Sequence, residues 1–328
     1  MVDNLLRTTV LGVNEHNFET VALEIFRYQS IHCEVYNRYI KHLQLDTTKI
    51  TRIEDIPYLP IMFFKNFEVC TNQFEPQIIF ESSSTTGTGI SKHYVKSLDW
   101  YNTAFRKSFE HAFGSPDNFC HLALLPGYLE RSNSSLVYQV NDFISKSQFS
   151  ESGFYLNNLT TLAQQLTTNI EQQIPTVLWG VSFALLDFAE NHKIDLSNIR
   201  IIETGGMKGR RKEITRAEMH GILNTAFNTD YISGEYGMTE LMSQAYADKA
   251  GLFTCAPWMK VKGREINDPL TPAFPGKHCV LNIIDLANID SCAFIATDDI
   301  GKIDTVGRFE VLGRLDNSDT RGCNLLIA

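Results

Sequence analysis

Residues 81–93 of the chain read Glu-Ser-Ser-Ser-Thr-Thr-Gly-Thr-Gly-Ile-Ser-Lys-His and follow an apolar, strand-like segment at 77–80. Glycine lets the backbone approach an anion closely, hydroxyl and N–H groups donate hydrogen bonds, and a lysine adds positive charge. This composition predicts a phosphate-binding loop, whereas a polar surface loop is the alternative when the run is taken alone. The residues expected to contact phosphate are Ser82, Ser83, Ser84, Thr85, Thr86, Gly87 and Lys92.

The spacing of the run excludes two common phosphate-binding motifs. A P-loop has four residues between its first glycine and a Gly-Lys-Ser/Thr element, but here Lys92 follows Ser91. The dinucleotide fingerprint has a third glycine where this chain has Lys92. The run instead resembles the Ser-Ser-Gly-Thr-Thr-Gly signature of adenylate-forming enzymes, with Ser84 in place of one glycine and Lys92 two places late.

Three apolar runs, at 119–125, 176–180 and 200–206, each end in a polar or glycine turn. Helical spacing of apolar residues at 17–45 and 96–113 adds two helices, the second of them directly after the loop. This alternation predicts an α/β fold with a parallel or mixed sheet. Beyond residue 231 the pattern is mostly that of strands, at 280–285, 293–296 and 308–312.

The same patterns predict how the chain is divided. We expect an N-terminal helical region at 1–75, an α/β subdomain with the phosphate-type loop at 76–235, and a β-rich subdomain at 236–328 that completes a nucleotide site. No Pro/Gly/Ser linker separates the last two, so the three parts are expected to form one integrated unit.

Composition and charge limit the partners. The net charge of -9 over 328 residues disfavours nucleic acids and anionic membranes, because both need a concentrated positive face. No apolar stretch approaches the roughly 18–20 residues of a membrane helix, and the N-terminus lacks a signal pattern, so a cytoplasmic protein without membrane insertion is expected. The seven cysteines are scattered, which disfavours structural zinc and a disulfide framework.

A second motif follows at 233–240, Ser-Gly-Glu-Tyr-Gly-Met-Thr-Glu. Gly237 lets a turn approach a nucleotide, Tyr236 offers a flat face to a base, and Thr239 and Glu240 supply oxygens for a phosphate and its Mg²⁺. The alternative is a tight turn before a helix that begins at Thr239. The motif also matches the Tyr-Gly-x-Thr-Glu element of adenylate-forming enzymes at every fixed position, which favours the functional interpretation.

Two further motifs lie near the C-terminus. Thr297-Asp298-Asp299-Ile300-Gly301 resembles an element in which an aspartate, here Asp299, binds the ribose hydroxyls; the alternative is a pair of acidic residues in a turn. Gly313-Arg314-Leu315-Asp316-Asn317 resembles the hinge of the superfamily, which implies a ribose or phosphate contact for Arg314 rather than a surface ion pair. Gly205, Gly206 and Met207 stand where the superfamily lines the adenine.

Together the motifs resemble the acyl-protein synthetase family of bacterial fatty-acid reductase systems. The resemblance covers residues from about Pro60 onward, and the ending Arg321-Gly322-Cys323 supports it. It implies the large N-terminal domain of adenylate-forming enzymes, ATP and Mg²⁺ as cofactors, and Lys92, Thr239, Glu240 and Cys323 as catalytic residues, with Glu240 as the metal ligand. It also implies no small lid domain, so that Lys92 or a partner must supply the main cation.

The implied reaction activates a carboxylic acid, expected to be a fatty acid, as an acyl adenylate. The acyl group then passes to a thiol, that of Cys323 or of an acyl-accepting protein such as a reductase or carrier, while a structural role for Cys323 stays open. Two alternatives remain: an ATP-independent acyltransferase that uses acyl-CoA or an acyl carrier, and a nonenzymatic nucleotide-binding subunit.

Overall fold

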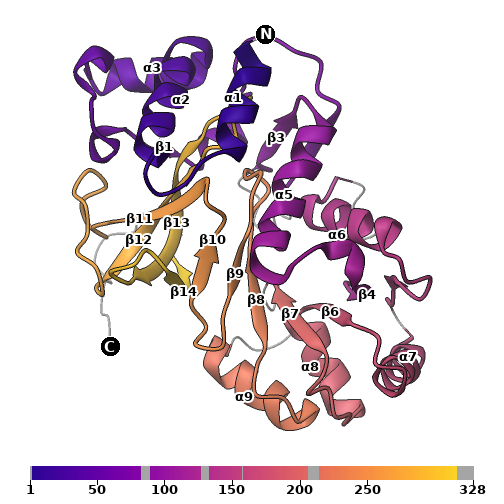
Figure 1. The fold of residues 1–328 in the computed structure, drawn as a ribbon. Helices are drawn as coiled ribbons and strands as arrows, with labels where there is room; N and C mark the ends of the chain where they lie inside the picture. Colours follow the sequence, from indigo (N-terminus) through magenta and orange to yellow (C-terminus); the bar gives the residue numbers. More distant parts are fainter. Residues whose placement is uncertain (1, 83–88, 127–132, 157, 206–213, 316–328) are drawn as a thin grey trace.

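A computed structural model describes residues 2–82, 89–126, 133–156, 158–205 and 214–315 (Figure 1). Its described strands form a 12-stranded mixed sheet and a separate two-stranded hairpin. The order along the large sheet is β11-β12-β13-β14-β10-β9-β8-β7-β6-β4-β5, with β1 paired to β13. The expected mixed α/β fold is therefore confirmed.

One half of the large sheet is parallel. Strands β5, β4, β6, β7 and β8 pair in parallel, and every residue of β4 and β6 is buried because helices cover the sheet. The elements of this half are β4 (Cys120–Leu124), α6 (Ser135–Lys146), β5 (Gly153–Phe154), α7 (Leu159–Glu171), β6 (Thr176–Val181), α8 (Ser182–Asn191), β7 (Arg200–Thr204), α9 (Arg216–Phe227) and β8 (Ser233–Tyr236).

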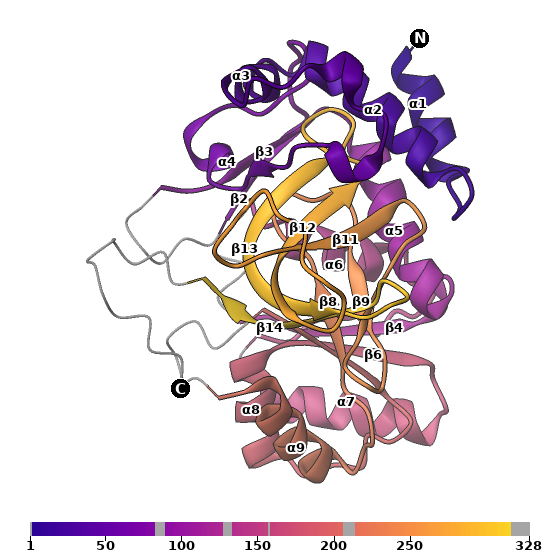
Figure 2. The same ribbon diagram turned by 90° about the vertical axis from the view of Figure 1, so that its left-hand side faces the viewer.

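The other half is antiparallel from β8 onward, apart from β1, which pairs in parallel with β13. Figures 1 and 2 show these strands curving away from the parallel half, with β13 strongly bent. The strands are β9 (Ala245–Ala247), β10 (Phe253–Cys255), β11 (Met259–Arg264), β12 (His278–Asp285), β13 (Phe294–Ile303) and β14 (Phe309–Arg314). The expected strand at 280–285 lies within β12, and those at 293–296 and 308–312 overlap β13 and β14.

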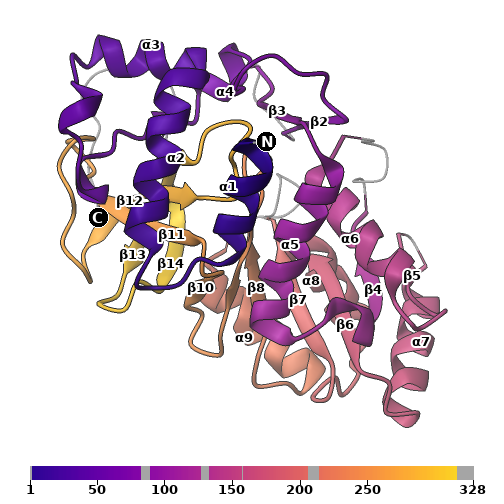
Figure 3. The ribbon, with the colours of Figure 1, turned by 45° about the horizontal axis from the view of Figure 1, so that its top comes forward.

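The N-terminal region is helical and packs on the antiparallel half (Figure 3). The side chain of Gln29 donates to the carbonyl oxygens of Asn288 and Ile289 and accepts from the N–H of Ala293. The elements are α1 (Val2–Leu11), α2 (Phe18–His32), α3 (Glu34–His42), the 3₁₀ turns η1 (Thr47–Lys49) and η2 (Ile53–Asp55), β1 (Leu59–Pro60) and α4 (Phe63–Asn66).

The prediction of one continuous helix at 17–45 was wrong. Cys33 has extended backbone angles, φ -97° and ψ 103°, and forms a β-bridge with Thr71. The helix therefore ends at His32 and a second one begins at Glu34. The apolar spacing of the two helices is similar, so periodicity could not show this break.

The segment after the first motif is also different from the prediction. Strands β2 (Ile78–Glu81) and β3 (Lys92–Val95) form a hairpin that brackets residues 82–91. Helix α5 (Leu98–Phe113) begins only after β3, capped by the Ser97 hydroxyl, and the turn η3 (Pro116–Asn118) follows it. The loop is thus held by two paired strands instead of opening directly into a helix.

In the part of the chain that the structure describes, no helix has both the length and the hydropathy needed to cross a bilayer.

Candidate functional site

Three residues predicted from three separate motifs meet at one point of the sheet. The Tyr236 hydroxyl on β8 donates to Oδ2 of Asp299 on β13 at 2.7 Å, and Nε of Arg314 on β14 donates to Oδ1 of Asp299 at 2.9 Å. Tyr236 and Asp299 are buried, whereas the Arg314 side chain is 67% exposed. Asp299 raises the pKa of Arg314, and burial together with Asp299 raises the pKa of Tyr236. The carboxylate thus has both oxygens directed at donors, the arrangement that suits two neighbouring hydroxyls of a ligand.

A β-bulge sets the register of this cluster. Gly301 pairs with Val311 and Ile300 with Gly313, so Leu312 is the extra residue on β14. Because of the bulge, Asp299 faces Arg314; an uninterrupted ladder would place Gly313 there. The acidic pair of this motif lies inside a strand, which excludes the turn alternative.

Two aromatic rings pack against Tyr236. Its ring contacts Phe253 and Phe309 edge-on, with centroids 5.9 and 5.2 Å away, and those two rings stack on each other. Tyr236 is therefore fixed in position by packing as well as by its hydrogen bond.

The turn that carries Thr239 and Glu240 contains no helix, which excludes the other alternative for this motif. Its backbone is held by buried side chains from distant segments. Asp285 accepts from the N–H groups of Met242 and Ser243 at 2.8 and 2.9 Å, and Asn288 donates to the carbonyl oxygen of Glu240 at 2.8 Å. The turn is thereby fixed before any ligand binds.

Glu240 itself is buried, and a hydrogen bond joins its side chain to Ser91 beside β3. Burial raises its pKa, while the nearby Arg314 opposes this effect. Among the described residues, no group of three or more His, Cys, Asp or Glu side chains could hold a metal ion. Magnesium, however, is often held by one or two carboxylates together with substrate phosphates, so Glu240 fits the expected Mg²⁺ ligand.

Lys92 and Ser82 lie at the base of the phosphate-type loop. Nζ of Lys92 is 3.7 Å from Oε1 of Glu81 across the hairpin, and its side chain is 46% exposed. The Ser82 hydroxyl accepts from the N–H of Ser91 at 3.0 Å, so it closes the loop. The remaining predicted residues of this loop, together with three others, lie outside the described residues: Ser83, Ser84, Thr85, Thr86, Gly87, Gly206, Met207 and Cys323.

Gly205 and Gly237 border a polar cluster that the sequence did not reveal. Gly205 follows β7 with φ 72°, a conformation that favours glycine. Next to it, the Thr204 hydroxyl donates to the carboxyl group of Glu235. A Cβ on Gly237 would lie 2.5 Å from Oε1 of Glu235, so the glycine leaves room for this group. Burial raises the pKa of Glu235 to about 7, which makes it a titrating group beside the Tyr236 cluster.

A second buried carboxylate lies on the opposite face of the same strands. Glu203 accepts from the Ser182 hydroxyl at 2.8 Å and pairs with Nη2 of Arg216 at 3.2 Å. Burial raises its pKa, but His220, Arg216 and Ser182 outweigh that effect and the net shift is downward. Sequence reasoning missed these residues because their partners lie on other elements; the signal available was a glutamate within each of the strands β7 and β8.

His93 ties β3 to the Thr239 turn. Nδ1 lies 2.9 Å from the carbonyl oxygen of Thr239, and Nε2 lies 3.2 Å from Oδ1 of Asn288. Only 1% of the residue is exposed, and burial lowers its pKa to about 4. The ring is therefore neutral at pH 7 and donates to one of the two oxygens.

This burial gives a pH dependence that can be isolated by mutation. The unfolded chain binds a proton near pH 6.5 and the native ring near pH 4, so the stability contributed by His93 is present above pH 6.5 and lost as the pH falls toward 4. Between pH 7 and pH 5 this loss is about 2 kcal/mol of unfolding free energy. We expect the stability difference between wild type and His93→Gln, measured by urea unfolding, to shrink by that amount.

Thr71→Val is the matched control. It removes a buried hydroxyl that donates to the carbonyl oxygen of Ile289 and no titrating group, so its effect should be equal at both pH values. A difference for His93→Gln that is also constant would show that folding does not lower the pKa of the His93 ring.

Several solved structures are similar in fold to this chain. A 2-hydroxyisobutyryl-CoA ligase in complex with 2-HIB-AMP and CoA aligns with a TM-score of 0.66 at 12% identity, over 91% of this chain and 70% of its own. ATP-bound MatB from Rhodopseudomonas palustris aligns with a TM-score of 0.51 at 14% identity, over 74% and 49%. O-succinylbenzoate coenzyme A synthetase from Bacillus subtilis, in complex with AMP, aligns with a TM-score of 0.50 at 17% identity, over 72% and 49%.

Sequence comparison assigns the family. A search of curated protein sequences finds no match. The family model described as acyl-protein synthetase, LuxE, matches residues 160–328, which is just over half of the chain. Family and fold together support activation of a small carboxylic acid as an acyl adenylate. The chain belongs to the LuxE acyl-protein synthetase family and is a ligase-type enzyme.

Proposed function

We propose that the protein uses ATP and Mg²⁺ to activate a fatty acid and then passes the acyl group to a thiol. In the first step a carboxylate oxygen of the acid attacks the α-phosphorus of ATP, and pyrophosphate leaves. In the second step a thiolate attacks the acyl carbonyl, and AMP leaves. The proposal rests on the convergence of Tyr236, Asp299 and Arg314 beside Glu240, supported by the family to which the chain belongs.

Each residue has a distinct proposed role. Asp299 accepts hydrogen bonds from the ribose hydroxyls, and Arg314 contacts the ribose or a phosphate. Glu240 is the protein ligand of Mg²⁺, with Thr239 beside it on the phosphate. Negative charge on the phosphates increases as pyrophosphate departs, so cations and N–H donors directed at them lower the barrier. We assign that task to Lys92 and to the loop residues Ser82, Ser83, Ser84, Thr85, Thr86 and Gly87. We assign the binding of the adenine to Gly205, Gly206, Met207, Tyr236 and Gly237.

The acceptor is proposed to be the thiol of Cys323 or that of a partner protein such as a reductase or carrier. A thiolate is the reactive form, and a thioester keeps the acyl group activated for a further transfer. The use of ATP is consistent with the cytoplasmic location expected from the sequence.

ATP–pyrophosphate exchange with short, long and aromatic acids tests the first step. We expect exchange with long-chain acids, a decrease of about tenfold in Lys92→Ala, equal to ~1.4 kcal/mol of barrier, and no change in Cys323→Ser. Lys302→Ala is a matched control, because Lys302 also pairs with a glutamate across two strands, at 3.6 Å, and has a side chain 39% exposed.

Other outcomes separate the alternatives. Labelling of Cys323 by acyl-CoA without nucleotide would mean an ATP-independent acyltransferase. Nucleotide binding without exchange or acylation would mean a nonenzymatic nucleotide-binding subunit. Loss of ATP–pyrophosphate exchange in Cys323→Ser would contradict the proposed order, in which adenylation precedes acyl transfer to the thiol.

A further inference from the structure

Strand β3 and the residue before it direct alternate side chains toward the turn that carries Thr239 and Glu240. Successive side chains of a strand point to opposite faces, and here Ser91 and His93 are each 1% exposed, whereas the Lys92 side chain between them is 46% exposed. Nδ1 of His93 lies 2.9 Å from the carbonyl oxygen of Thr239, and the Ser91 hydroxyl hydrogen-bonds the Glu240 carboxylate. The two inward-facing residues therefore hold two neighbouring residues of the turn.

Ser91 is also the residue at which the phosphate-type loop closes. Its N–H donates to the Ser82 hydroxyl at 3.0 Å, and its carbonyl oxygen accepts from the N–H of Ser82 at 3.0 Å. These two hydrogen bonds extend the hairpin by one step beyond the pair formed by Glu81 and Lys92. The backbone of Ser91 thus belongs to the base of the loop, while its hydroxyl contacts Glu240. One residue joins the loop proposed to bind phosphate to the carboxylate proposed to bind Mg²⁺.

The Glu240 carboxylate is buried among neutral donors. The residue is 4% exposed, and its carboxylate accepts from the Ser91 hydroxyl and from its own N–H group. Arg314 attracts it electrostatically, but Arg314 is already paired with Asp299, whose charge acts on Glu240 in the opposite sense. Burying a carboxylate is costly unless a cation and hydrogen bonds compensate its charge. A divalent cation would supply that charge, provided that the carboxylate is held in the right orientation.

We propose that Ser91 is a positioning residue that orients the Glu240 carboxylate for Mg²⁺ and couples metal binding to the phosphate-type loop. This inference rests on the proposed function, in which Glu240 is the protein ligand of Mg²⁺. A hydroxyl donor occupies one of about four lone-pair sites of a carboxylate and leaves the others for a metal. Partners that orient a metal ligand in this way contribute about 10–100-fold to metal affinity. Because Ser91 acts through Glu240, its hydroxyl should matter for nucleotide binding only when Mg²⁺ is present.

Calorimetric titration of the full chain with ATP, in the absence of any acid, measures this contribution without turnover. We expect Ser91→Ala to bind ATP about tenfold more weakly than wild type in Mg²⁺ and equally well in EDTA. Ser91→Thr keeps the hydroxyl, so its affinity should stay within about threefold of wild type. Thermal unfolding shows whether each variant is folded, and Ser91→Cys, whose thiol is a weak donor, repeats the test if Ser91→Ala is not.

The exchange reaction gives a second readout. Ser91→Ala should need about tenfold more Mg²⁺ for half of its maximal rate, because the metal ligand is less well oriented. The maximal rate at saturating Mg²⁺ should stay close to that of wild type, since the ligand itself is still present. A variant that only destabilises the fold would not separate the two quantities in this way.

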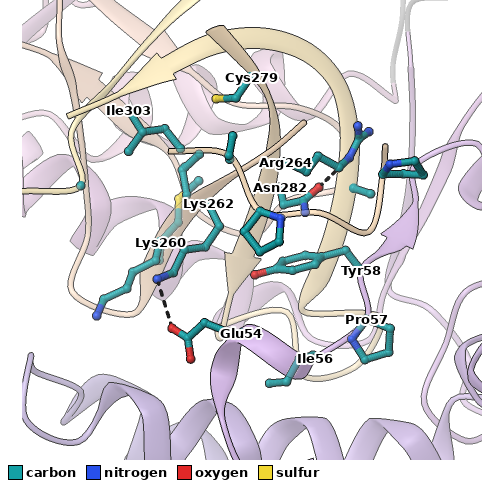
Figure 4. A pocket seen from close by; sticks show the side chains of 18 of the residues that line it. Glu54, Ile56, Pro57, Tyr58, Lys260, Lys262, Arg264, Cys279, Asn282 and Ile303 are labelled. Carbon is teal, nitrogen blue, oxygen red and sulfur yellow. Dashed lines mark hydrogen bonds and ion pairs between the residues drawn. The ribbon is translucent and has the colours of Figure 1, made fainter. Parts of the chain in front are cut away.

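Matched variants separate positioning from stability and from charge. Ser291→Ala also removes a buried hydroxyl, which donates to the carbonyl oxygen of Val69 at 2.7 Å, and it should change neither titration. Lys92→Ala should weaken ATP binding both in Mg²⁺ and in EDTA, because its charge acts on the phosphates directly. Lys262→Ala is the control for that lysine: Lys262 pairs with Glu54 at 3.8 Å and its side chain is 44% exposed, but it lines a cavity of about 2370 Å³ beside β11 (Figure 4).

The outcomes distinguish this inference from the proposed function. If Glu240→Gln removes the effect of Mg²⁺ on ATP binding and a folded Ser91→Ala protein keeps it, the positioning role is wrong and the metal ligand stands. If Mg²⁺ affects ATP binding equally in wild type and Glu240→Gln, the proposed ligand is wrong and the inference fails with it. Equal weakening of Ser91→Ala in EDTA, or a folded Ser91→Thr protein as weak as Ser91→Ala, would also overturn the inference.

Discussion

An Asp299→Ala variant is expected to lose at least about a hundredfold of the acid-dependent ATP–pyrophosphate exchange. The carboxylate is buried and accepts from Tyr236 and Arg314, and in the proposed function its remaining lone pairs accept from the ribose hydroxyls. Hydrogen bonds to a charged group are worth about 1.5–3 kcal/mol each, and ~2.7 kcal/mol corresponds to a factor of one hundred. Removal also leaves the buried Tyr236 hydroxyl without its acceptor, which adds to the effect.

Two variants separate this role from a structural one. Asp299→Asn keeps the shape and one acceptor oxygen, so it should fold and show an intermediate loss, seen mainly as a raised KM for ATP. Glu310→Gln, which removes an exposed carboxylate on the neighbouring strand, should exchange at the wild-type rate. If a folded Asp299→Ala protein catalyses ATP–pyrophosphate exchange at the wild-type rate, Asp299 does not bind the ribose.

Gly301→Ala is expected to be the most destabilising single-methyl change in the β-rich half. A Cβ at this position would lie 2.2 Å from the carbonyl oxygen of Glu310, which is backbone and cannot rotate away, and 3.1 Å from the side chain of Leu281. Overpacking of this kind costs about 1–3 kcal/mol, and the backbone contact favours the upper end. Urea unfolding should therefore show a loss of about 3 kcal/mol.

The change should also affect the cluster, because Gly301 adjoins the bulge that aligns Arg314 with Asp299. We expect a lower affinity for ATP in whatever fraction remains folded. Gly313→Ala is the matched control: it lies on the facing strand, and nothing stands within 4 Å of its would-be Cβ. Equal stability of the two variants would show that β14 shifts freely, against the tight register described here.

The sequence alone was sufficient to predict the elements that depend only on residues close together in the chain. The apolar runs at 119–125 and 176–180 became β4 and β6 because a fully buried parallel strand needs apolar residues on both faces. Tyr236, Asp299 and Arg314 could also be selected as candidate site residues from the sequence, because each lies in a short motif whose residue types suit binding of a nucleotide. That they touch one another is a property of the sheet order, which no single motif contains.

Residues with distant partners could not be predicted. His93, Asp285 and Asn288 fix the Thr239 turn, yet they come from β3, the end of β12 and the loop after it. The break at Cys33 depends on Thr71 in the same way. In each case the decisive hydrogen bond joins residues about 40 or more positions apart, so neither periodicity nor composition carries the signal.

The pairing of β1 with β13 has a consequence for how the protein is made. Leu59 pairs with Ile295, which the ribosome adds 236 positions later. At about 5–20 residues per second, the N-terminal segment waits roughly 10–50 s for its partner strand. During that time Phe26 of α2 and Tyr36 of α3 lack Phe294, the β13 residue against which both pack. Chaperones that cover these side chains during synthesis should therefore raise the yield of this protein in cells.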